Sequence, residues 1–310
     1  MTKTTLKIRG CLSKIFAMMG ILLVVLAAAA YALLAVSPVP EKSSFDFDLA
    51  RIRAMVMEDS EPLPLRLNAL KIAEGSFPQL LTLAGGNLNP QRMAMVSYQL
   101  IYTDGSIVFD PVCAPEDFEK AFRGQPYDRE KYNQLQEGLR KSSLIFTTHE
   151  HFDHIGGIAR SPYLAEIESK VRLTRAQIEN TGSETGFTNE MLARLTPLEA
   201  GHYHRAAPGV VLIQAPGHSP GGQLIYIQLQ NGAEYLLTGD AAWNALNLER
   251  LTGRPLATSL VLREDRAETA SELRTLYDLS RSEPLNLIIA HDSNQLDNLT
   301  QSGLLGSQFE

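Results

Sequence analysis

The sequence predicts an α/β protein in which helices cover two packed β-sheets, preceded by one N-terminal transmembrane helix. Three observations lead to this prediction. Residues 15–36 form an apolar run without a single charge. From about residue 60 onward, short strand patterns alternate with helical patterns, as expected when helices pack on sheets. His and Asp residues gather where four of the expected strands end, which indicates one shared site.

The composition is that of a folded globular protein. Of 310 residues, 44% are hydrophobic and 20% are charged, which excludes disordered and collagen-like classes. Two cysteines are too few for a disulfide framework or a cysteine-based zinc module. Four of the 28 basic residues precede the apolar run, so 24 bases and 35 acids leave residues 37–310 with a net charge of about −11. No nucleic-acid partner is expected, because such a partner is held by Lys and Arg.

Residues 15–36 are expected to cross a membrane. An α-helix rises about 1.5 Å per residue, so this run could span a hydrocarbon layer of about 30 Å. The segment before it carries four bases and no acid, namely Lys3, Lys7, Arg9 and Lys14. The positive-inside rule then keeps residues 1–14 in the cytoplasm and places the body outside it, in the periplasm of a Gram-negative cell. The alternative is a cleaved signal peptide and a secreted body, and Ala28 and Ala30 offer a small-residue cleavage pattern.

The expected organisation has four parts. They are a basic cytoplasmic flank at 1–14, a transmembrane helix or signal segment at 15–36, a linker and lead-in at 37–60, and one globular domain at 61–310. Pro38 and Pro40 end the apolar helix and begin the extended linker.

The elements of the globular domain follow from periodicity and turn residues. In its first half we expect strands at 65–73, 95–102 and 106–109, helices at 116–122 and 130–139, and a short apolar strand at 143–147. In its second half we expect strands at 210–213, 223–229 and 235–237, a helix at 263–279 and a buried strand at 285–290. Asp104-Gly105 and Asn231-Gly232 are hairpin turns.

The first polar cluster is the segment HEHFDH at residues 149–154, directly after an expected strand. Two His residues separated by one position in extended backbone project to the same side, and a turn then brings Asp153 and His154 towards a neighbouring point. Imidazole nitrogens and carboxylate oxygens are suitable ligands for zinc or a similar divalent ion. By the same alternation, Glu150 should point away from such a site.

Three more residues stand at strand ends. His218 lies in a Gly/Pro-rich turn after the strand at 210–213, Asp240 follows the strand at 235–237, and His291 follows the last strand. Gly and Pro suit a backbone that curves tightly around an ion. Together with residues 149–154, these three predict a metal site.

This combination closely resembles the metallo-β-lactamase superfamily, and the resemblance covers nearly all of residues 60–300. It implies an αββα sandwich with a two-metal site at one sheet edge, and it makes residues 61–310 a hydrolase domain. The implied ligands are His149, His151 and His218 for the first metal, and Asp153, His154 and His291 for the second. Asp240 resembles the carboxylate that bridges both metals. This ligand set fits two divalent ions, first of all zinc, with manganese and iron also compatible.

The resemblance implies a hydrolase that uses a metal-bridging hydroxide to cleave an ester, lactone or similar carbonyl bond of a small molecule. The metals acidify water and polarise the substrate carbonyl. Asp153 would additionally orient the hydroxide. The alternatives are a metallo-phosphodiesterase or β-lactam hydrolase on the same fold, and a non-catalytic metal-binding interaction protein.

Differences from family patterns indicate which branch of the superfamily the chain resembles most. Asp240 places the chain nearer to the glyoxalase II, lactonase and phosphodiesterase branches than to zinc β-lactamases, which often have Cys or no bridging acid there. Only 19 residues follow His291, so the helical region with which glyoxalase II proteins hold glutathione is not expected here, nor is a glutathione thioester as the substrate. Lactonases of the superfamily carry a Tyr three positions after the bridging Asp. Trp243 stands there in this chain, so an apolar ring is kept and a phenolic donor is lost.

Five other residues have simpler interpretations. His202 and His204 match no ligand position of the family and are expected in a loop near the site or on plain surface. Ser219 is expected to support the turn beside His218. Asp292 either orients a ligating His or caps the following turn. Cys113 is expected to be a buried small apolar residue.

Overall fold

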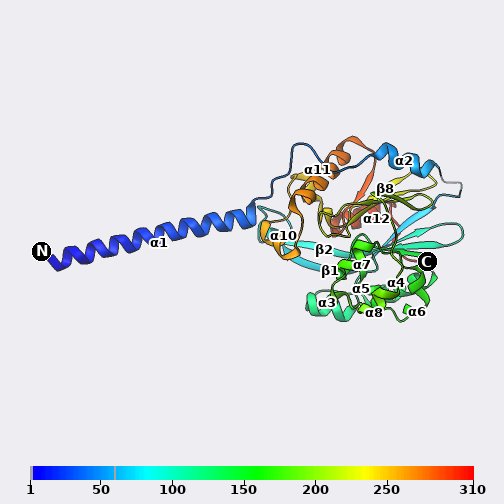
Figure 1. The fold of residues 1–310 in the computed structure, drawn as a ribbon, viewed down its shortest axis with the longest axis horizontal. Coiled ribbons are helices and arrows are strands. Elements are labelled where there is room, and N and C mark those ends of the chain that lie inside the picture. Colours follow the sequence, from blue (N-terminus) through cyan, green and yellow to red (C-terminus); the bar gives the residue numbers. More distant parts are fainter. Residues whose placement is uncertain (1–2, 59–60) are drawn as a thin grey trace.

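The computed structural model describes residues 3–58 and 61–310, and of residues 3–13 and 15 it describes the backbone alone. Helix α1 (Lys3–Ala35) projects from a two-sheet body (Figure 1). Its segment Phe16–Ala35 has 20 residues and a mean hydropathy of 2.5, long and apolar enough to cross a membrane by length and composition. The side chains of Lys3, Lys7 and Arg9, expected in the cytoplasmic flank, lie outside the described part, as do residues 59–60 at the expected domain boundary.

The first sheet has the order β1-β2-β3-β4. Its strands are β1 (Arg66–Pro78), β2 (Pro90–Ile101), β3 (Ser106–Phe109) and β4 (Leu144–Phe146). The pairing is antiparallel except between β3 and β4, which are parallel. Ile101 pairs with Ser106, so the expected Asp104-Gly105 hairpin is confirmed.

The second sheet has the order β5-β6-β7-β8-β9. Its strands are β5 (Tyr203–Ala207), β6 (Val210–Gln214), β7 (Gln223–Gln228), β8 (Glu234–Leu237) and β9 (Asn286–Ile288). Only β8 and β9 pair in parallel among these strands. The turn at Asn231-Gly232 is confirmed, with Gly232 at a φ of 86° that favours glycine.

Helices cover the outer face of each sheet, while an apolar core fills the space between the sheets (Figure 1). Phe109, Phe146 and Leu212 belong to that central core. The first sheet is covered by helices between residues 115 and 194, namely α3 (Pro115–Ala121), α4 (Arg129–Lys141), α5 (Phe152–Ala159), α6 (Leu164–Ile167), α7 (Arg175–Asn180) and α8 (Asn189–Arg194). The predicted sandwich of two packed sheets with helices outside is therefore confirmed.

The other outer face carries α2 (Leu49–Met57) and α11 (Arg266–Ser282). Ile52 and Val56 of α2 are fully buried against the second sheet, so the lead-in expected at 37–60 contributes to the core. Three further helices lie at strand ends, namely α9 (Ala245–Glu249), α10 (Leu256–Leu262) and α12 (Ser293–Gln301).

Two details differ from the expected elements. The helix expected at 263–279 begins at Arg266, because Asp265 caps its N-terminus by accepting from the backbone N–H groups of Ala267 and Glu268. Arg263 instead ends α10 in the left-handed conformation. Strand β5 was not expected, since its short sequence YHRAA lacks a clear period-two pattern.

Candidate metal centre

The two parallel strand pairs bring the polar segments to one edge of both sheets. In the first sheet, Phe109 of β3 lies opposite Phe146 of β4, so the residues that follow both strands leave at the same edge. The chain after β4 passes through His149, and His151 then takes the N-cap position of α5. Asp153 and His154 stand in the first turn of this helix. The turn expected after His151 is therefore a helix start.

The second sheet delivers the remaining residues in the same way. Leu237 of β8 lies opposite Ile288 of β9. Asp240 follows β8 in the short 3-10 turn η4 (Gly239–Ala241), and His291 follows β9. His218 comes from the turn between β6 and β7.

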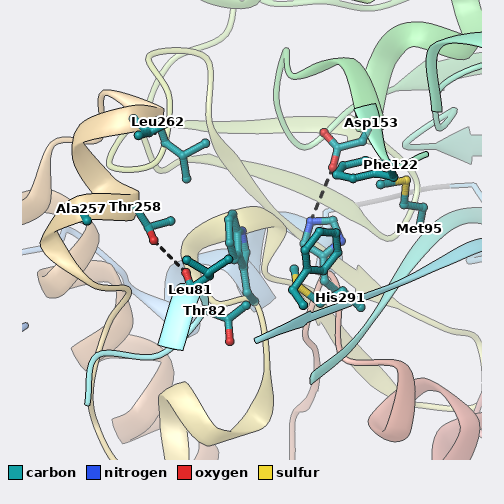
Figure 2. A pocket seen from close by; sticks show the side chains of 13 residues that line it. Leu81, Thr82, Met95, Phe122, Asp153, Ala257, Thr258, Leu262 and His291 are labelled. Atoms are coloured by element: carbon teal, nitrogen blue, oxygen red, sulfur yellow. Dashed lines mark hydrogen bonds and ion pairs between the residues drawn. The ribbon is translucent and has the colours of Figure 1, made fainter. Parts of the chain in front are cut away.

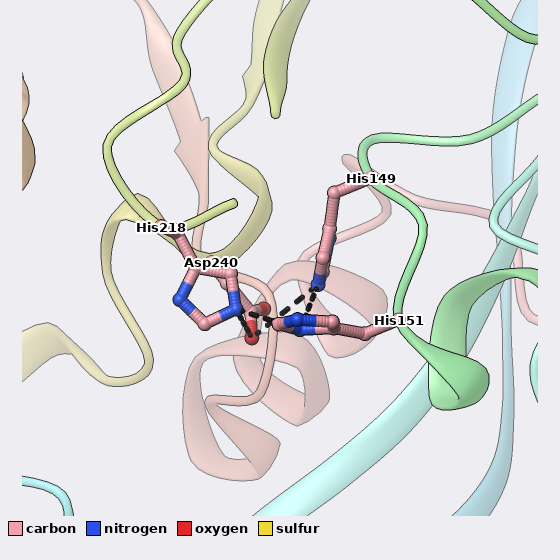
Figure 3. A group of neighbouring side chains, drawn as sticks. All are labelled: His149, His151, His218 and Asp240. Atoms are coloured by element: carbon pink, nitrogen blue, oxygen red, sulfur yellow. Dashed lines mark hydrogen bonds and ion pairs between the residues drawn. The ribbon is translucent and has the colours of Figure 1, made fainter. Parts of the chain in front are cut away.

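Four side chains form the first group (Figure 3). They are His149, His151, His218 and Asp240, each offering a ligand atom within 4.8 Å of the others. Nδ1 of His151 is 3.1 Å from Nε2 of His149 and 3.0 Å from Nε2 of His218. Three imidazole nitrogens converge here from three different directions, a donor set that suits a divalent ion.

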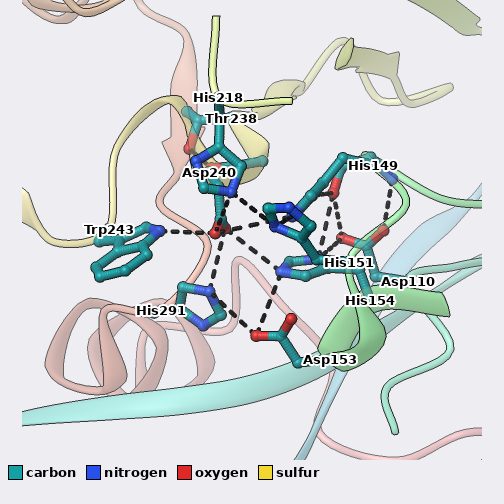
Figure 4. Close-up of polar contacts among 12 residues, drawn as sticks. Asp110, His149, His151, Asp153, His154, His218, Thr238, Asp240, Trp243 and His291 are labelled. Carbon is teal, nitrogen blue, oxygen red and sulfur yellow. Dashed lines mark hydrogen bonds and ion pairs between the residues drawn. The ribbon is translucent and has the colours of Figure 1, made fainter. Parts of the chain in front are cut away.

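Asp153, His154 and His291 form the second group beside it (Figure 4). Oδ2 of Asp153 lies 3.9 Å from Nε2 of His154 and 3.8 Å from Nε2 of His291. His154 and His291 are buried, whereas Asp153 is half-buried.

Asp240 lies between the two groups (Figure 4). Its Oδ2 is 3.2 Å from Nε2 of His218, and its Oδ1 is 3.1 Å from Nε2 of His291 and 3.4 Å from Nε2 of His154. Oδ1 of Asp240 and Nε2 of His154 are buried and have no hydrogen-bond partner among the described residues. Buried polar atoms are normally partnered, so these two atoms fit a site built to hold cations.

The outer nitrogens of the histidines are held by oxygen atoms. Nδ1 of His291 is 2.8 Å from the backbone carbonyl of Ala94, and Nδ1 of His218 is 2.7 Å from the Glu264 carboxylate. Nδ1 of His154 is 3.1 Å from Oδ2 of Asp110. An acceptor at Nδ1 selects the tautomer with its proton there, which leaves the Nε2 lone pair free to bind a metal.

Asp110 was not among the expected site residues. Besides His154, its carboxylate accepts from the backbone N–H and the hydroxyl of Thr148, at 2.6 and 2.9 Å. Asp110 directly follows β3 and adopts a φ of 50°, a left-handed conformation that Asp tolerates better than most residues. Its place after a strand was the signal that could have identified it.

Arg254 and Glu264 were also not expected. The Arg254 guanidinium forms a buried ion pair with Glu264 and donates to the backbone carbonyl of Asp240 at 2.8 Å. Burial alone would raise the pKa of Glu264, but Arg254 and His218 lower it to about 2. Glu264 is therefore an anion that fixes His218 from behind.

The electrostatics of the two groups suit cations. Burial and the neighbouring His154 hold the pKa of His149 well below its usual value, which keeps the imidazole neutral. Burial opposes ionisation of Asp240, but the surrounding imidazoles hold its pKa well below the ordinary value. In the second group, burial opposes protonation, but Asp153 and Asp240 raise the pKa of both His154 and His291, and Asp110 raises that of His154 further. A ligating imidazole is neutral and a ligating carboxylate is ionised, so metal binding at the second group would displace protons from these two histidines.

A cavity of about 380 Å³ opens beside the second group (Figure 2). Asp153 and His291 line one end of it, and Trp243 is also part of its lining. Its other walls are mainly apolar and come from Phe77, Leu81, Thr82, Met93, Met95, Phe122, Ala257, Thr258, Val261 and Leu262. We call this cavity the apolar pocket, and its size is in the range of small-molecule sites.

Trp243 contacts both the pocket and the metal groups. Its indole N–H donates to Oδ2 of Asp240 at 2.6 Å, and its ring lies 4.8 Å from the guanidinium carbon of Arg254. The indole donor is thus directed at a carboxylate rather than into the pocket.

The other residues weighed from the sequence lie outside the two groups. Glu150 accepts from the Ser219 hydroxyl and from the backbone N–H of Gly221, which ties the His218 turn to the segment after β4. Asp292 caps α12 by accepting from Gln295 N–H. Nε2 of His202 lies 2.6 Å from the backbone carbonyl oxygen of Asp46.

His204 and Cys113 complete this set. His204 lies in β5 and is half-buried, rather than in a loop as one expectation had it. Cys113 is fully buried, as expected.

Comparisons with known proteins agree with this geometry. Residues 95–278 match the Metallo-beta-lactamase superfamily. The chain is 32% identical over 106 residues to an N-acyl homoserine lactonase of Bacillus sp, covering 34% of this chain and 40% of the relative. It is 32% identical over 115 residues to an N-acyl homoserine lactonase of Bacillus cereus, covering 36% and 44%. The chain thus matches less than half the length of these relatives.

Solved structures share the fold over a longer stretch. An N-acyl homoserine lactone hydrolase with the product N-hexanoyl-L-homoserine at its metal centre superposes with a TM-score of 0.60 at 20% identity, covering 76% of this chain and 96% of that one. AidC, a dizinc quorum-quenching lactonase, gives a TM-score of 0.52 at 15% identity, covering 74% and 90%. Because the sequence identities are this low, the structural similarity shows a shared fold alone.

Proposed function

The chain belongs to the Metallo-beta-lactamase superfamily, and on this basis we propose that it is a two-metal hydrolase that opens lactone or ester bonds of small molecules. The observation that carries the proposal is the position of Asp240. Its two carboxylate oxygens face two separate groups of ligating side chains. The N-acyl homoserine lactonases among the relatives indicate lactones as the substrate class.

Each proposed ligand has a defined place. His149, His151 and His218 would hold the first ion, and Asp153, His154 and His291 the second, with Asp240 shared. We propose zinc, since the donors are imidazole and carboxylate groups and the related AidC is a dizinc lactonase. When bound, the ions supply Lewis acidity, which polarises a carbonyl oxygen and acidifies water.

The chain's own side chains perform the remaining tasks. Asp153 lines the pocket and is half-buried, so its carboxylate can accept a proton from an attacking water and orient it towards the substrate. The apolar pocket would hold the hydrocarbon part of the substrate and exclude water from it. Glu264 and Asp110 keep His218 and His154 oriented before the substrate arrives, and Arg254 holds Glu264 and the Asp240 backbone in place.

Hydrolysis assays with the full chain test this function. Zinc-loaded protein should open N-acyl homoserine lactones, should be slow on β-lactams and phosphodiesters, and should lose activity when a chelator removes the metal. His151→Ala should lower kcat/KM at least about a hundredfold. His204→Ala is the matched control, since His204 belongs to neither group, and it should leave the rate unchanged. Full metal loading without hydrolysis of any lactone or ester would refute the enzyme and favour a metal-binding interaction protein.

We also propose that residues 15–36 anchor the protein, with residues 1–14 in the cytoplasm and the hydrolase domain at 61–310 outside it. The supporting features are the length, hydropathy and exposure of the α1 segment together with the four bases before it. Helix α2 (Leu49–Met57) precedes these bounds but packs on the domain, and its side chains complete the core. In a bacterial host, the chain should stay full-length in the membrane fraction after alkaline extraction. A soluble product cleaved near Ala30 would show a signal peptide instead.

A further inference from the structure

We propose that the apolar rim of the pocket rests on the surface of the bilayer that α1 spans, and that the pocket takes the acyl chain of an amphiphilic lactone or ester directly from that bilayer. This inference rests on the proposed hydrolase and on the proposed anchor. It deepens both, because it gives the substrate class and its route to the metal centre. We call the exposed apolar side chains Leu81, Leu88, Leu260 and Val261 the juxtamembrane surface, of which Leu81 and Val261 form the rim of the pocket.

The juxtamembrane surface lies where α1 meets the body. Helix α10 lies against α1, and the body side nearest to α1 carries α10 (Figure 1). The backbone N–H of Gly85 donates to the carbonyl of Leu34 at 2.9 Å. The guanidinium of Arg266, at the start of α11, donates to the carbonyl of Val36 at 3.2 Å. The end of the proposed membrane span is therefore tied to both segments that form the rim.

The side chains of the juxtamembrane surface are apolar and exposed. Val261 is 82% exposed, Leu88 77% and Leu260 62%, and Leu81 is exposed as well. Exposing apolar side chains to water is unfavourable, at roughly 25 cal/mol per Å² of apolar surface. Contact with the bilayer interface would remove this cost.

The charge pattern of the same segments also fits a lipid surface. Residues 75–91 and 255–262 contain no charged residue, although the body as a whole is acidic. Arg263, which ends α10, is exposed beside them. Exposed apolar segments without charged side chains of their own suit the interfacial region of a bilayer.

The rim leads directly into the apolar pocket. Leu81 and Val261 are both exposed and pocket-lining, so the pocket reaches the surface between them. The two walls are joined by the Thr258 hydroxyl, which donates to the carbonyl of Leu81 at 2.9 Å. Asp153 and His291 stand at the opposite end of the pocket (Figure 2). An acyl chain that enters from the bilayer side would thus place its head group at the metal centre.

Site-directed spin labels in the reconstituted full chain test the contact without any need for activity. Labels are placed at Leu88→Cys and Leu260→Cys in a Cys11→Ser background, in vesicles that contain phosphatidylglycerol. Met57→Cys is the matched control, since Met57 is also 77% exposed but lies on α2, on the far side of the body from α1 (Figure 1). The labels at 88 and 260 should collide more with oxygen than with a water-soluble nickel chelate, and the label at 57 should do the reverse. Aqueous labels at 88 and 260 would overturn the inference, whether or not the protein hydrolyses lactones.

Kinetics of a charged double variant test the route. Leu88→Asp combined with Leu260→Asp changes two exposed side chains outside the pocket lining, and Met57→Asp is the control. The double variant should hydrolyse a long-chain lactone in vesicles about tenfold more slowly, with an unchanged rate on a short-chain soluble lactone. Equal rates of variant and wild type on the vesicle substrate would overturn the route. Membrane-buried labels without hydrolysis of either lactone would support the contact and refute the proposed function instead.

Discussion

Oδ2 of Asp110 lies 3.1 Å from Nδ1 of His154, and the same carboxylate accepts from the backbone and hydroxyl of Thr148. One side chain at the end of β3 thereby orients the segment that follows β4. It connects the parallel strand pair of the first sheet to the second group of ligands.

Replacing Asp110 should weaken the second metal. Asp110→Asn keeps the shape but removes the anion that accepts from His154, so we expect about 10–100-fold lower metal affinity at the second site. Isothermal titration of the apoprotein with zinc measures this change. Asp117→Asn is the control, because Asp117 is also a buried Asp but lies in α3 and pairs with Arg160 instead of a ligating His. An unchanged second binding constant in Asp110→Asn would contradict the orienting role.

Close packing of α5 should be required both for the stability of the fold and for metal binding. A Cβ on Gly157 would lie 2.3 Å from the Val112 carbonyl oxygen and 2.5 Å from that of Pro111, so Gly157→Ala must displace the helix. We expect a loss of about 1–3 kcal/mol in the free energy of unfolding, together with weaker metal binding, because α5 carries Asp153 and His154. Gly105→Ala meets only open space and should change neither quantity in urea unfolding and zinc titration. Equal stabilities of the two variants would count against this packing.

Glu272 should make stability depend on pH. Burial raises its pKa to about 7, so folding favours the protonated acid. The stability of the folded state therefore falls as the pH rises from about 4.5 through 7. The free energy of unfolding of Glu272→Gln, taken relative to that of the wild type, should therefore rise by about 2–3 kcal/mol as the pH goes from 5 to 8. Urea unfolding at several pH values measures the difference, with the exposed Glu190→Gln as control. A difference that does not change with pH would show that Glu272 does not titrate in this range.

Trp243 should affect metal binding through its hydrogen bond to Asp240 more than it affects substrate binding. Trp243→Phe keeps an aromatic ring in the pocket but removes the N–H that donates to Asp240 Oδ2. We expect metal affinity to fall about tenfold while KM for a long-chain lactone stays the same. Zinc titration and steady-state kinetics separate the two effects. A raised KM with unchanged metal affinity would assign Trp243 to substrate binding instead.

The sequence predicted the parts of the site that follow strands. Runs such as those before His149 and His291 are short, apolar and followed directly by a ligating type of residue, so their place at a sheet edge could be inferred. The same rule could have identified Asp110. It did not, because only the parallel pairing of β3 with β4 shows that Asp110 reaches His154.

Other features had no local signal. Arg254 and Glu264 lie on either side of α10, and their role depends on a buried ion pair formed after folding. The pocket joins the end of β1 to α10, which are nearly 180 positions apart in the chain, so its existence depends on tertiary packing. Helix α5 was read as a turn because its first residues were recognised only as ligands.

The metal stoichiometry of the full chain tests the two-metal centre most directly. Inductively coupled plasma mass spectrometry on zinc-loaded, dialysed protein should find two ions per chain in the wild type. In Asp240→Asn it should find one or none, because both groups lose the carboxylate that faces them. Two firmly held ions in both proteins, or no ion in the wild type, would contradict a centre organised around Asp240.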